Sequence, residues 1–216
     1  MTSATLRISE IFYSLQGEAR TVGLPTVFIR LTGCPLRCQY CDTEYAFSGG
    51  VIYQTKEIIQ EIRQYDTPYI TVTGGEPLAQ PGCLHLLKTL CDLGYDVSLE
   101  TSGALDVSEV DSRVVKVMDL KTPGSRELEK NRLENVDFLS SDDQVKFVIC
   151  NREDYVWAKQ TIEEYDLVDK VSDVLFSPSN KELEARDLAE WILADQLKVR
   201  MQVQLHKYLW GNEAGH

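Results

Sequence analysis

Basic residues, histidines and long apolar runs are all scarce in this sequence. Its 216 residues include 22 Lys and Arg against 34 Asp and Glu, which gives a formal net charge of -12. A nucleic-acid-binding surface needs concentrated positive charge, so direct binding of nucleic acid is not expected. No apolar run approaches the roughly 20 residues that cross a bilayer, so no membrane contact is expected. A chain of this length can bury one sizeable core, and we expect a single domain over residues 1–216.

Cysteine is present, but not in the pattern of a disulfide framework. Nothing at the N-terminus resembles a signal peptide, which predicts a cytoplasmic protein with reduced thiols. Cys34, Cys38 and Cys41 form a C-x3-C-x2-C motif. An iron–sulfur cube normally takes four cysteine ligands, and no fourth cysteine lies nearby, so the motif predicts a 4Fe–4S cluster with one iron open to a ligand. The other cysteines fall in apolar patterns and are expected in the core: Cys83, Cys91 and Cys150.

Two other metal sites would use the same cysteines. A structural zinc ion needs four protein ligands, usually in paired spacings, but no second C-x2-C pair is present. The histidines lie far along the chain, at His85, His206 and His216. An electron-carrying ferredoxin would need a fourth cysteine to close the cube. Both alternatives lack a ligand, so the open cluster is the favoured interpretation.

Short β-rich runs alternate with helical patterns, which is typical of βαβ units. Several strands are apolar on both faces, as buried parallel strands are; we expect strands at 26–31, 69–73, 96–100, 114–119, 144–149, 173–176 and 201–205. Helices are expected at 55–64, 81–93, 152–165 and 182–195, the last with a capping box formed by Ser179 and Glu182. The polar segment 122–143 is expected to be a loop with a short helix. The repeats are too few for a closed barrel, so we expect an α/β fold, a partial, open (β/α) barrel with mostly parallel strands.

Polar motifs follow three of these predicted strands, where parallel β/α folds place their ligand sites. The strand 69–73 leads into Thr73-Gly74-Gly75-Glu76-Pro77, whose paired glycines let a ligand approach the backbone. Ser102 follows the next strand and can hydrogen-bond a carboxylate or a ribose hydroxyl. Asp119 and Lys121 follow the strand after that. Ordinary turns and a solvated Asp–Lys pair would use the same residues, and those interpretations stay open.

The cysteine motif resembles that of the radical S-adenosylmethionine (AdoMet) superfamily. The resemblance implies a cluster on Cys34, Cys38 and Cys41 whose fourth iron chelates the amino and carboxylate groups of AdoMet. It also implies that the reduced cluster cleaves AdoMet to methionine and a 5′-deoxyadenosyl radical, which takes a hydrogen atom from the substrate. The AdoMet-binding residues that it implies are Tyr40, Cys41, Asp42, Gly75, Ser102, Asp119, Leu120, Lys121 and Ser177.

A narrower resemblance extends over nearly the whole chain. Residues 14–18, 23–30, 41–43 and 204–210 resemble the 7-carboxy-7-deazaguanine synthases of the queuosine and deazapurine pathway. This implies a carbon–nitrogen lyase that contracts 6-carboxy-5,6,7,8-tetrahydropterin to 7-carboxy-7-deazaguanine with loss of ammonia. It further implies a homodimer, an electron donor such as flavodoxin, and a magnesium ion near Thr43. The substrate-binding residues that it implies are Leu15, Gln16, Gly17, Glu18, Arg30, Thr73 and His206.

The chemistry of these residues fits a pterin carboxylate. The amide of Gln16 can read donor and acceptor edges of a flat ring. The guanidinium of Arg30 suits a carboxylate, since it can bind through two parallel hydrogen bonds. Glu18 can accept from ring N–H groups or move a proton. Together with His206, which we expect beside Thr73 at a strand end, Glu18 and Arg30 are the predicted catalytic residues. A surface ion pair for Arg30 and a packed C-terminal histidine stay open as alternatives.

Two other functions stay open from the sequence. An activase that generates a glycyl radical on a partner protein shares the cysteine spacing and a similar size, but it gives no reason for Gln16, Glu18 and Arg30. A non-enzymatic metal-binding or electron-transfer module is more distant. Cleavage of AdoMet by an open cluster would exclude the module.

Overall fold

The computed structural model describes residues 4–180, 182–211, 213 and 215. Within this part of the chain, nine strands form one sheet in the order β3-β1-β2-β4-β5-β6-β7-β8-β9. The strands are β1 (Thr5–Leu15), β2 (Pro25–Leu31), β3 (Val51–Gln54), β4 (Tyr69–Gly74), β5 (Asp96–Thr101), β6 (Val115–Asp119), β7 (Gln144–Ile149), β8 (Asp173–Pro178) and β9 (Arg200–Met201).

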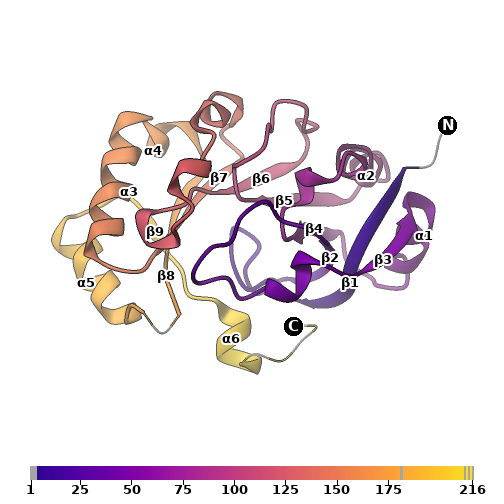
Figure 1. Ribbon diagram of the computed structural model, residues 1–216, viewed down its shortest axis with the longest axis horizontal. Helices are drawn as coiled ribbons and strands as arrows, with labels where there is room; N and C mark the ends of the chain where they lie inside the picture. Colours follow the sequence, from indigo (N-terminus) through magenta and orange to yellow (C-terminus); the bar gives the residue numbers. More distant parts are fainter. Residues whose placement is uncertain (1–3, 181, 212, 214, 216) are drawn as a thin grey trace.

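The sheet is parallel along most of its width and open at both edges. Each neighbouring pair from β2 to β9 is parallel, whereas β1 runs antiparallel to both β2 and β3. The edge strands β3 and β9 do not pair with each other, so the curved sheet does not close (Figure 1). The prediction of an open, mostly parallel α/β fold is therefore confirmed.

The helices lie at the two ends of the sheet and below its middle. In Figure 1, α1 and α2 lie at the right, α3, α4 and α5 at the left, and α6 below the centre. Their bounds are α1 (Thr55–Ile62), α2 (Gly82–Asp92), α3 (Arg152–Glu164), α4 (Leu167–Lys170), α5 (Ala185–Ala194) and α6 (Leu205–Trp210). No helix among the described residues is long and apolar enough to cross a membrane.

Two hydrophobic cores hold these helices against the sheet. Helix α1 buries Ile58, Ile59 and Ile62, which recur on one face at helical spacing. With α2 they pack on β1, β2, β4 and β5. The second core packs α3 and α5 on β6, β7 and β8. The cysteines outside the motif are buried, which confirms their predicted place in the core: Cys83, Cys91 and Cys150.

Most predicted elements are present close to their expected ends. Two strands were missed, and the predicted C-terminal strand differs from the structure. Strands β1 and β3 were not predicted, because β1 carries polar side chains such as Arg7 and Glu10 between its apolar ones. The predicted strand 201–205 is wrong. Only Arg200 and Met201 pair with β8, and α6 begins at Leu205, whose N–H bonds to the carbonyl of Gly17 instead of to a strand.

Two smaller expectations also need correction. Ser179 does bond to Glu182, at 2.9 Å. However, α5 begins at Ala185 with Glu184 at its N-cap, so the pair does not cap the helix. The segment 122–143 contains three short 3-10 helices where one short helix was predicted: Pro123–Ser125, Leu128–Lys130 and Leu133–Phe138.

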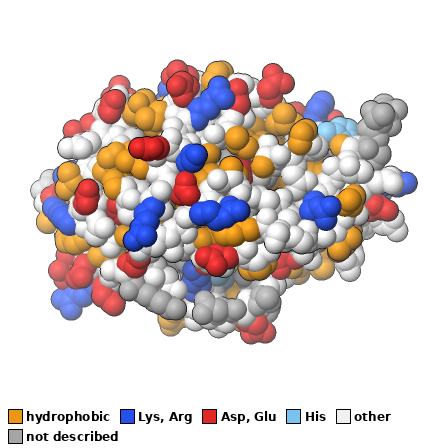
Figure 2. All heavy atoms as spheres, in the orientation of Figure 1, with side chains coloured by type: hydrophobic (Ala, Val, Ile, Leu, Met, Phe, Trp, Pro, Cys, Tyr) orange, Lys and Arg blue, Asp and Glu red, His pale blue; other side chains and the backbone are white. Residues whose placement is uncertain are grey.

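The surface agrees with the acidic composition. Figure 2 shows basic side chains spread among acidic and apolar ones over one face of the molecule. A formal net charge of -12 and this dispersed arrangement suit a small-molecule site inside the fold better than a phosphate-backbone surface.

Candidate functional site

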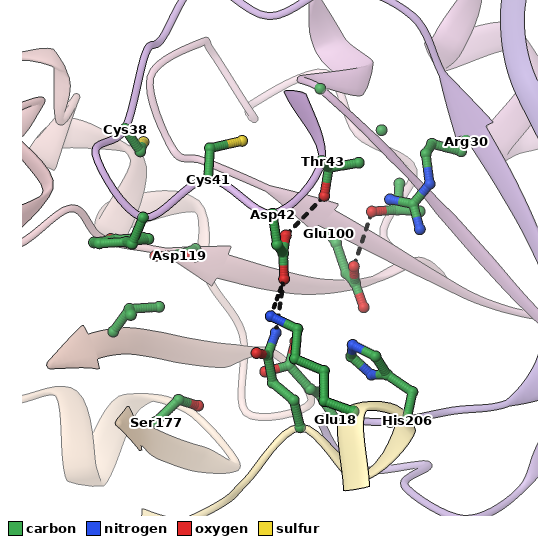
Figure 3. A pocket seen from close by; sticks show the side chains of 18 of the residues that line it. Glu18, Arg30, Cys38, Cys41, Asp42, Thr43, Glu100, Asp119, Ser177 and His206 are labelled. Atoms are coloured by element: carbon green, nitrogen blue, oxygen red, sulfur yellow. Dashed lines mark hydrogen bonds and ion pairs between the residues drawn. The ribbon is translucent and has the colours of Figure 1, made fainter. Parts of the chain in front are cut away.

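A cavity of about 470 Å³ lies at the C-terminal ends of the parallel strands. Strand ends of β4, β5, β6 and β8, the cysteine loop after β2, the turn after β1 and helix α6 all contribute side chains to it (Figure 3). Every predicted site residue lines this cavity except Leu120. The side chain of Leu120 packs in the second core, so any contact it makes with a ligand would come from its backbone.

The cysteine loop faces the cavity and is tied down by its backbone. Cys34, Cys38 and Cys41 are all partly exposed and line the cavity. The Gly33 N–H donates to the carbonyl of Ala46 at 2.7 Å, and the Gly33 carbonyl accepts from the N–H of Glu76 at 2.7 Å. These bonds hold the start of the loop against the end of β4.

The thiols fit a cluster better than a single metal ion. Among the described residues, no three His, Cys, Asp or Glu side chains converge so as to hold one ion, which a zinc site would require; His216 lies outside the described residues. A cube instead offers each thiolate its own iron. Burial raises the pKa of the thiols, to about 11 for Cys38, while the ammonium of Lys121 lowers it at all three. A nearby cation stabilises thiolates that bind iron.

Glycine is required where β4 meets the cysteine loop. A Cβ on Gly75 would lie 2.3 Å from the Gly33 carbonyl oxygen and 2.8 Å from Cys34 Cβ. Beside it, the buried carboxylate of Glu76 accepts from Thr101 Oγ1 and from the backbone N–H and hydroxyl of Ser102. The hydroxyl of Ser102 therefore already donates to Glu76, and its predicted contact with the cofactor remains a prediction.

Polar atoms without partners face the cavity near the end of β6. Asp119 Oδ2 pairs with Lys121 Nζ at 3.0 Å. Asp119 Oδ1 and the hydroxyl of Tyr40 are buried and have no hydrogen-bond partner within the described chain. Burial, and then the charge of Asp119, raise the pKa of Tyr40. Buried polar atoms are nearly always satisfied, so these two indicate a polar ligand. Ser177 lies across the cavity and accepts from Gln202 at 3.1 Å.

Arg30 is oriented by a carboxylate and two rings. Its Nε donates to Glu10 Oε1 at 2.7 Å, and both side chains are largely buried, at 16% and 21% exposed. The Tyr45 hydroxyl donates to the same oxygen at 2.7 Å. The guanidinium lies 5.7 Å from the ring centre of Phe12 and 5.9 Å from that of Tyr45. The surface ion pair left open from the sequence is thus a buried one. The pair uses Nε, and within the described part of the chain no hydrogen bond engages either Nη atom, so both can meet a ligand.

Opposite the cysteines, two carboxylates are held by polar partners. Glu18 Oε2 pairs with Lys146 Nζ at 2.8 Å. Glu100 accepts from Thr73 Oγ1 at 2.8 Å and from Gln16 Nε2 at 3.4 Å. Burial and the charge of Glu18 raise the pKa of Glu100. The Gln16 amide also bonds to Thr71 and to the Glu18 N–H, so it is engaged within the protein, and direct reading of a pterin edge by Gln16 remains a prediction.

Helix α6 closes one side of the cavity. A Cβ on Gly17 would lie 2.2 Å from His206 Nδ1, so the turn after β1 needs glycine for this helix to pack. Burial lowers the pKa of His206, which favours its neutral form. Burial disfavours the Asp42 carboxylate, but Lys207 Nζ at 2.5 Å holds the pKa of that carboxyl well below its usual range. His206 thus lies on a helix and not at the predicted strand end.

Comparison with known proteins agrees with this geometry. Residues 28–165 match the Radical SAM superfamily. The whole chain is 45% identical to the 7-carboxy-7-deazaguanine synthase of Chlorobaculum tepidum, over 99% of this chain and 98% of that protein. The chain belongs to the 7-carboxy-7-deazaguanine synthase family. It is also 40% identical to the Koribacter versatilis member, over 96% of this chain and 98% of that one. Both resemblances found in the sequence are confirmed.

The fold of the family is shared as well. The crystal structure of QueE from Escherichia coli superposes with a TM-score of 0.72 at 22% identity, over 94% of this chain and 95% of that one. Membership of the radical SAM superfamily implies AdoMet and a 4Fe–4S cluster. The three open thiols, the close approach at Gly75 and the unpaired atoms of Asp119 and Tyr40 fit these groups.

Several site residues of this family member were not predicted from the sequence. Glu10 and Tyr45 orient Arg30, Lys146 pairs with Glu18, and Lys207 pairs with Asp42. The only signal for Lys146 was a lysine inside the apolar run Gln144–Ile149. Glu10 and Tyr45 carried no signal, since their partners lie 20 and 35 residues away in the chain.

Proposed function

We propose that this protein is a carbon–nitrogen lyase that contracts 6-carboxy-5,6,7,8-tetrahydropterin to 7-carboxy-7-deazaguanine and releases ammonia, within queuosine and deazapurine synthesis. The observation that carries the proposal is the juxtaposition, in one cavity, of three thiols on one wall and, on the other, a polar set suited to a pterin carboxylate. That second set contains Arg30, Glu18 and His206.

The substrate would be bound by charge and hydrogen bonds on the wall opposite the cysteines. The free Nη atoms of Arg30 match a carboxylate through two parallel hydrogen bonds. Glu18 Oε1 is buried and unpaired within the described chain, so it can accept from a ring N–H. Together, the donors of Arg30 and the acceptor of Glu18 would fix the orientation of a flat ring relative to the cysteines.

Proton handling falls to groups whose pKa is shifted. The rearrangement exchanges N–H and C–H protons as ammonia leaves, which requires groups that can change protonation state near neutral pH. Burial raises the pKa of Glu100, toward neutral pH, and lowers that of His206, so that its imidazole is neutral and able to accept a proton. His206 lies at the cavity on α6, where it can accept or return a proton.

AdoMet and the cluster would occupy the wall formed by the cysteine loop and the ends of β4 to β6. Cys34, Cys38 and Cys41 would hold the cluster, which when bound would supply the electron for cleavage of AdoMet and so the radical that takes a hydrogen atom from the substrate. Gly75 permits close backbone approach there, and Asp119 Oδ1 accepts from a ligand hydroxyl or amine. The cofactor-binding set also takes in Tyr40, Asp42, Ser102, Lys121 and Ser177.

The proposal includes a magnesium ion, an electron donor and a second copy of the chain. Thr43 donates to Asp42 Oδ1 at 2.8 Å, which puts hydroxyl and carboxylate oxygens together on the cavity wall. Magnesium favours such oxygen ligands and keeps waters or substrate oxygens besides. Flavodoxin is the proposed electron donor and the cytoplasm the proposed location. The open edge strand β3, with exposed Val51 and Ile52, is consistent with a homodimer.

One experiment tests the proposal against its alternatives. The reconstituted protein is incubated without oxygen with a reductant, AdoMet and 6-carboxytetrahydropterin, and products are separated by chromatography. We expect 7-carboxy-7-deazaguanine and 5′-deoxyadenosine together. AdoMet cleavage with no deazaguanine would favour the glycyl-radical activase, and no cleavage at all would favour the non-enzymatic module.

A further inference from the structure

Lys146 is a buried cation on the cavity wall that the proposed reaction has not used. It lies on β7, opposite Asp119 of β6 in the strand register. The neighbouring Val145, Phe147 and Ile149 are buried in the core. The side chain of Lys146 is 13% exposed and lines the cavity. A buried ammonium is costly unless it is paired, so its partners indicate what it does.

Three carboxylates surround this ammonium. Glu18 Oε2 accepts from Lys146 Nζ at 2.8 Å. Burial disfavours the charge, but Glu18, Asp119 and Glu100 together keep the pKa of Lys146 above its usual range. Asp119 has a second cation in Lys121, and Glu100 has hydroxyl and amide donors. Glu18 is the one of the three to which Lys146 is directly bonded.

The two oxygens of Glu18 have different surroundings. Oε2 is taken by Lys146, whereas Oε1 is buried with no partner in the described chain. The backbone N–H of Glu18 is held by Gln16 Oε1 at 3.3 Å. The backbone and one carboxylate oxygen of Glu18 are therefore held, and the other oxygen is a buried, unsatisfied acceptor of a residue that lines the cavity. A buried acceptor without a partner indicates a ligand donor.

We propose that Lys146 is a positioning residue for the pterin substrate. By binding Oε2 of Glu18 it fixes the carboxylate, so that Oε1 meets a ring N–H of the substrate. The inference rests on the proposed function, because it takes the pterin as the ligand. A lysine that only balances buried charge would affect stability, but its effect on ligand binding would not depend on Glu18.

A double-mutant cycle separates these two roles. The variants are Lys146→Met, Glu18→Gln and the combination of both, each reconstituted with its cluster and AdoMet. The probe is 6-carboxypterin, an oxidised analogue that lacks the N5–H and N8–H groups of the substrate but keeps its ring N3–H and its 2-amino group. Its dissociation constant is measured without oxygen by fluorescence. We expect each single change to weaken binding by about 10-fold or more, in line with the loss of one partner of a buried charge pair.

The combined variant carries the decisive result. Because both changes remove the same contact, the dissociation constant of the combined variant should lie within about 3-fold of that of the single variant that binds the probe less tightly. Lys146→Arg should retain part of the affinity, since it keeps the charge. The matched control is Lys88→Met, which removes an exposed lysine paired with Asp92 on α2. It should bind within about 2-fold of the unaltered protein.

Two results would overturn the inference. One is a dissociation constant in Lys146→Met equal to that of the unaltered protein. The other is a dissociation constant about 100-fold higher than that of the unaltered protein in the combined variant, which would mean that the two single effects multiply. Thermal unfolding reports whether Lys146→Met folds. If it does not, Glu18→Gln is compared with the combined variant, which removes both charges together and so leaves no unpaired buried charge. That comparison still tests the inference. A further loss of about 10-fold there counts against the inference. Failure of the unaltered protein to convert 6-carboxy-5,6,7,8-tetrahydropterin to 7-carboxy-7-deazaguanine would instead reject the proposed function.

Discussion

The start of the cysteine loop is held against the end of β4 by backbone contacts, whereas the side chains proposed to bind the substrate on the opposite wall are held by ion pairs. At the loop, the backbone of Gly33 bonds to that of Glu76, and Gly75 packs directly on the loop. On the opposite wall, Arg30 pairs with Glu10 and Glu18 with Lys146. Cluster binding should therefore be most sensitive to changes of shape or of the thiols, and pterin binding to changes of charge on the opposite wall.

The largest effect is expected at the thiols. Cys34→Ala, Cys38→Ala or Cys41→Ala should each abolish the four-iron cluster, because thiolates make the iron bonds. Iron analysis and the visible absorption of the reconstituted protein measure this. The matched control is Cys83→Ala, which removes a buried core thiol and should keep full iron. Stoichiometric zinc with no iron after reconstitution would reject the mechanism.

The wall opposite the cysteines should be most sensitive at Arg30. Arg30→Ala removes a charge-assisted contact and leaves Glu10 without its cation, so we expect productive pterin binding to weaken by about 2–5 kcal/mol. Arg30→Lys should recover only part of this, since an ammonium lacks the planar fork. AdoMet cleavage without substrate should survive in both variants. Unchanged product formation in Arg30→Ala would mean that the arginine has only a structural role.

Shape should matter more than charge at Gly75. A methyl group there meets the Gly33 carbonyl oxygen at 2.3 Å, and overpacking of this kind costs about 1–3 kcal/mol. We expect Gly75→Ala to lower both the free energy of unfolding and the retention of the cluster. Gly23→Ala is the control, because its Cβ meets nothing within 4 Å and only its positive φ carries a cost. If Gly75→Ala retained as much cluster as Gly23→Ala, close packing at Gly75 would not be needed for cluster binding.

Magnesium should give the smallest effect. Chelation by EDTA should lower turnover while the iron stays bound, because the ion would position substrate oxygens. Thr43→Ala should raise the magnesium concentration needed for half-maximal turnover by about 10-fold. The cluster absorption should not change. Turnover that is indifferent to EDTA, with iron still present, would remove the ion from the proposal.

Sequence reasoning located the residues on the cysteine side of the cavity more completely than those on the opposite side, for a physical reason. The thiols and the Gly74-Gly75 pair each form a local pattern, because ligand spacing and close backbone approach are set within a few residues. The supports of Arg30 and Glu18 are long-range contacts: Lys146 and Glu18 are separated by 128 positions in the sequence. Local patterns cannot report such pairs, and Glu10, Tyr45 and Lys146 were missed as a result.

The same distinction explains the fold predictions. Strands buried on both faces, such as β4 and β7, were located from their apolar runs. The C-terminal segment was mispredicted because alternating apolar residues at 201, 203 and 205 imitate a strand. Its real conformation depends on a tertiary bond, the one from Leu205 to the carbonyl of Gly17.

The contacts of α6 also set an order of assembly. Residues 204–207 are synthesised after every strand of the sheet, yet they contact Gly17 and Asp42 near the start of the chain. A nascent chain that has reached β9 already contains every strand of the sheet and the cysteine loop. It still lacks the helix that covers one side of them. Until α6 packs against Gly17 and Asp42, the side of the cavity that it closes is open, and the three thiols that line the cavity can be reached from that side.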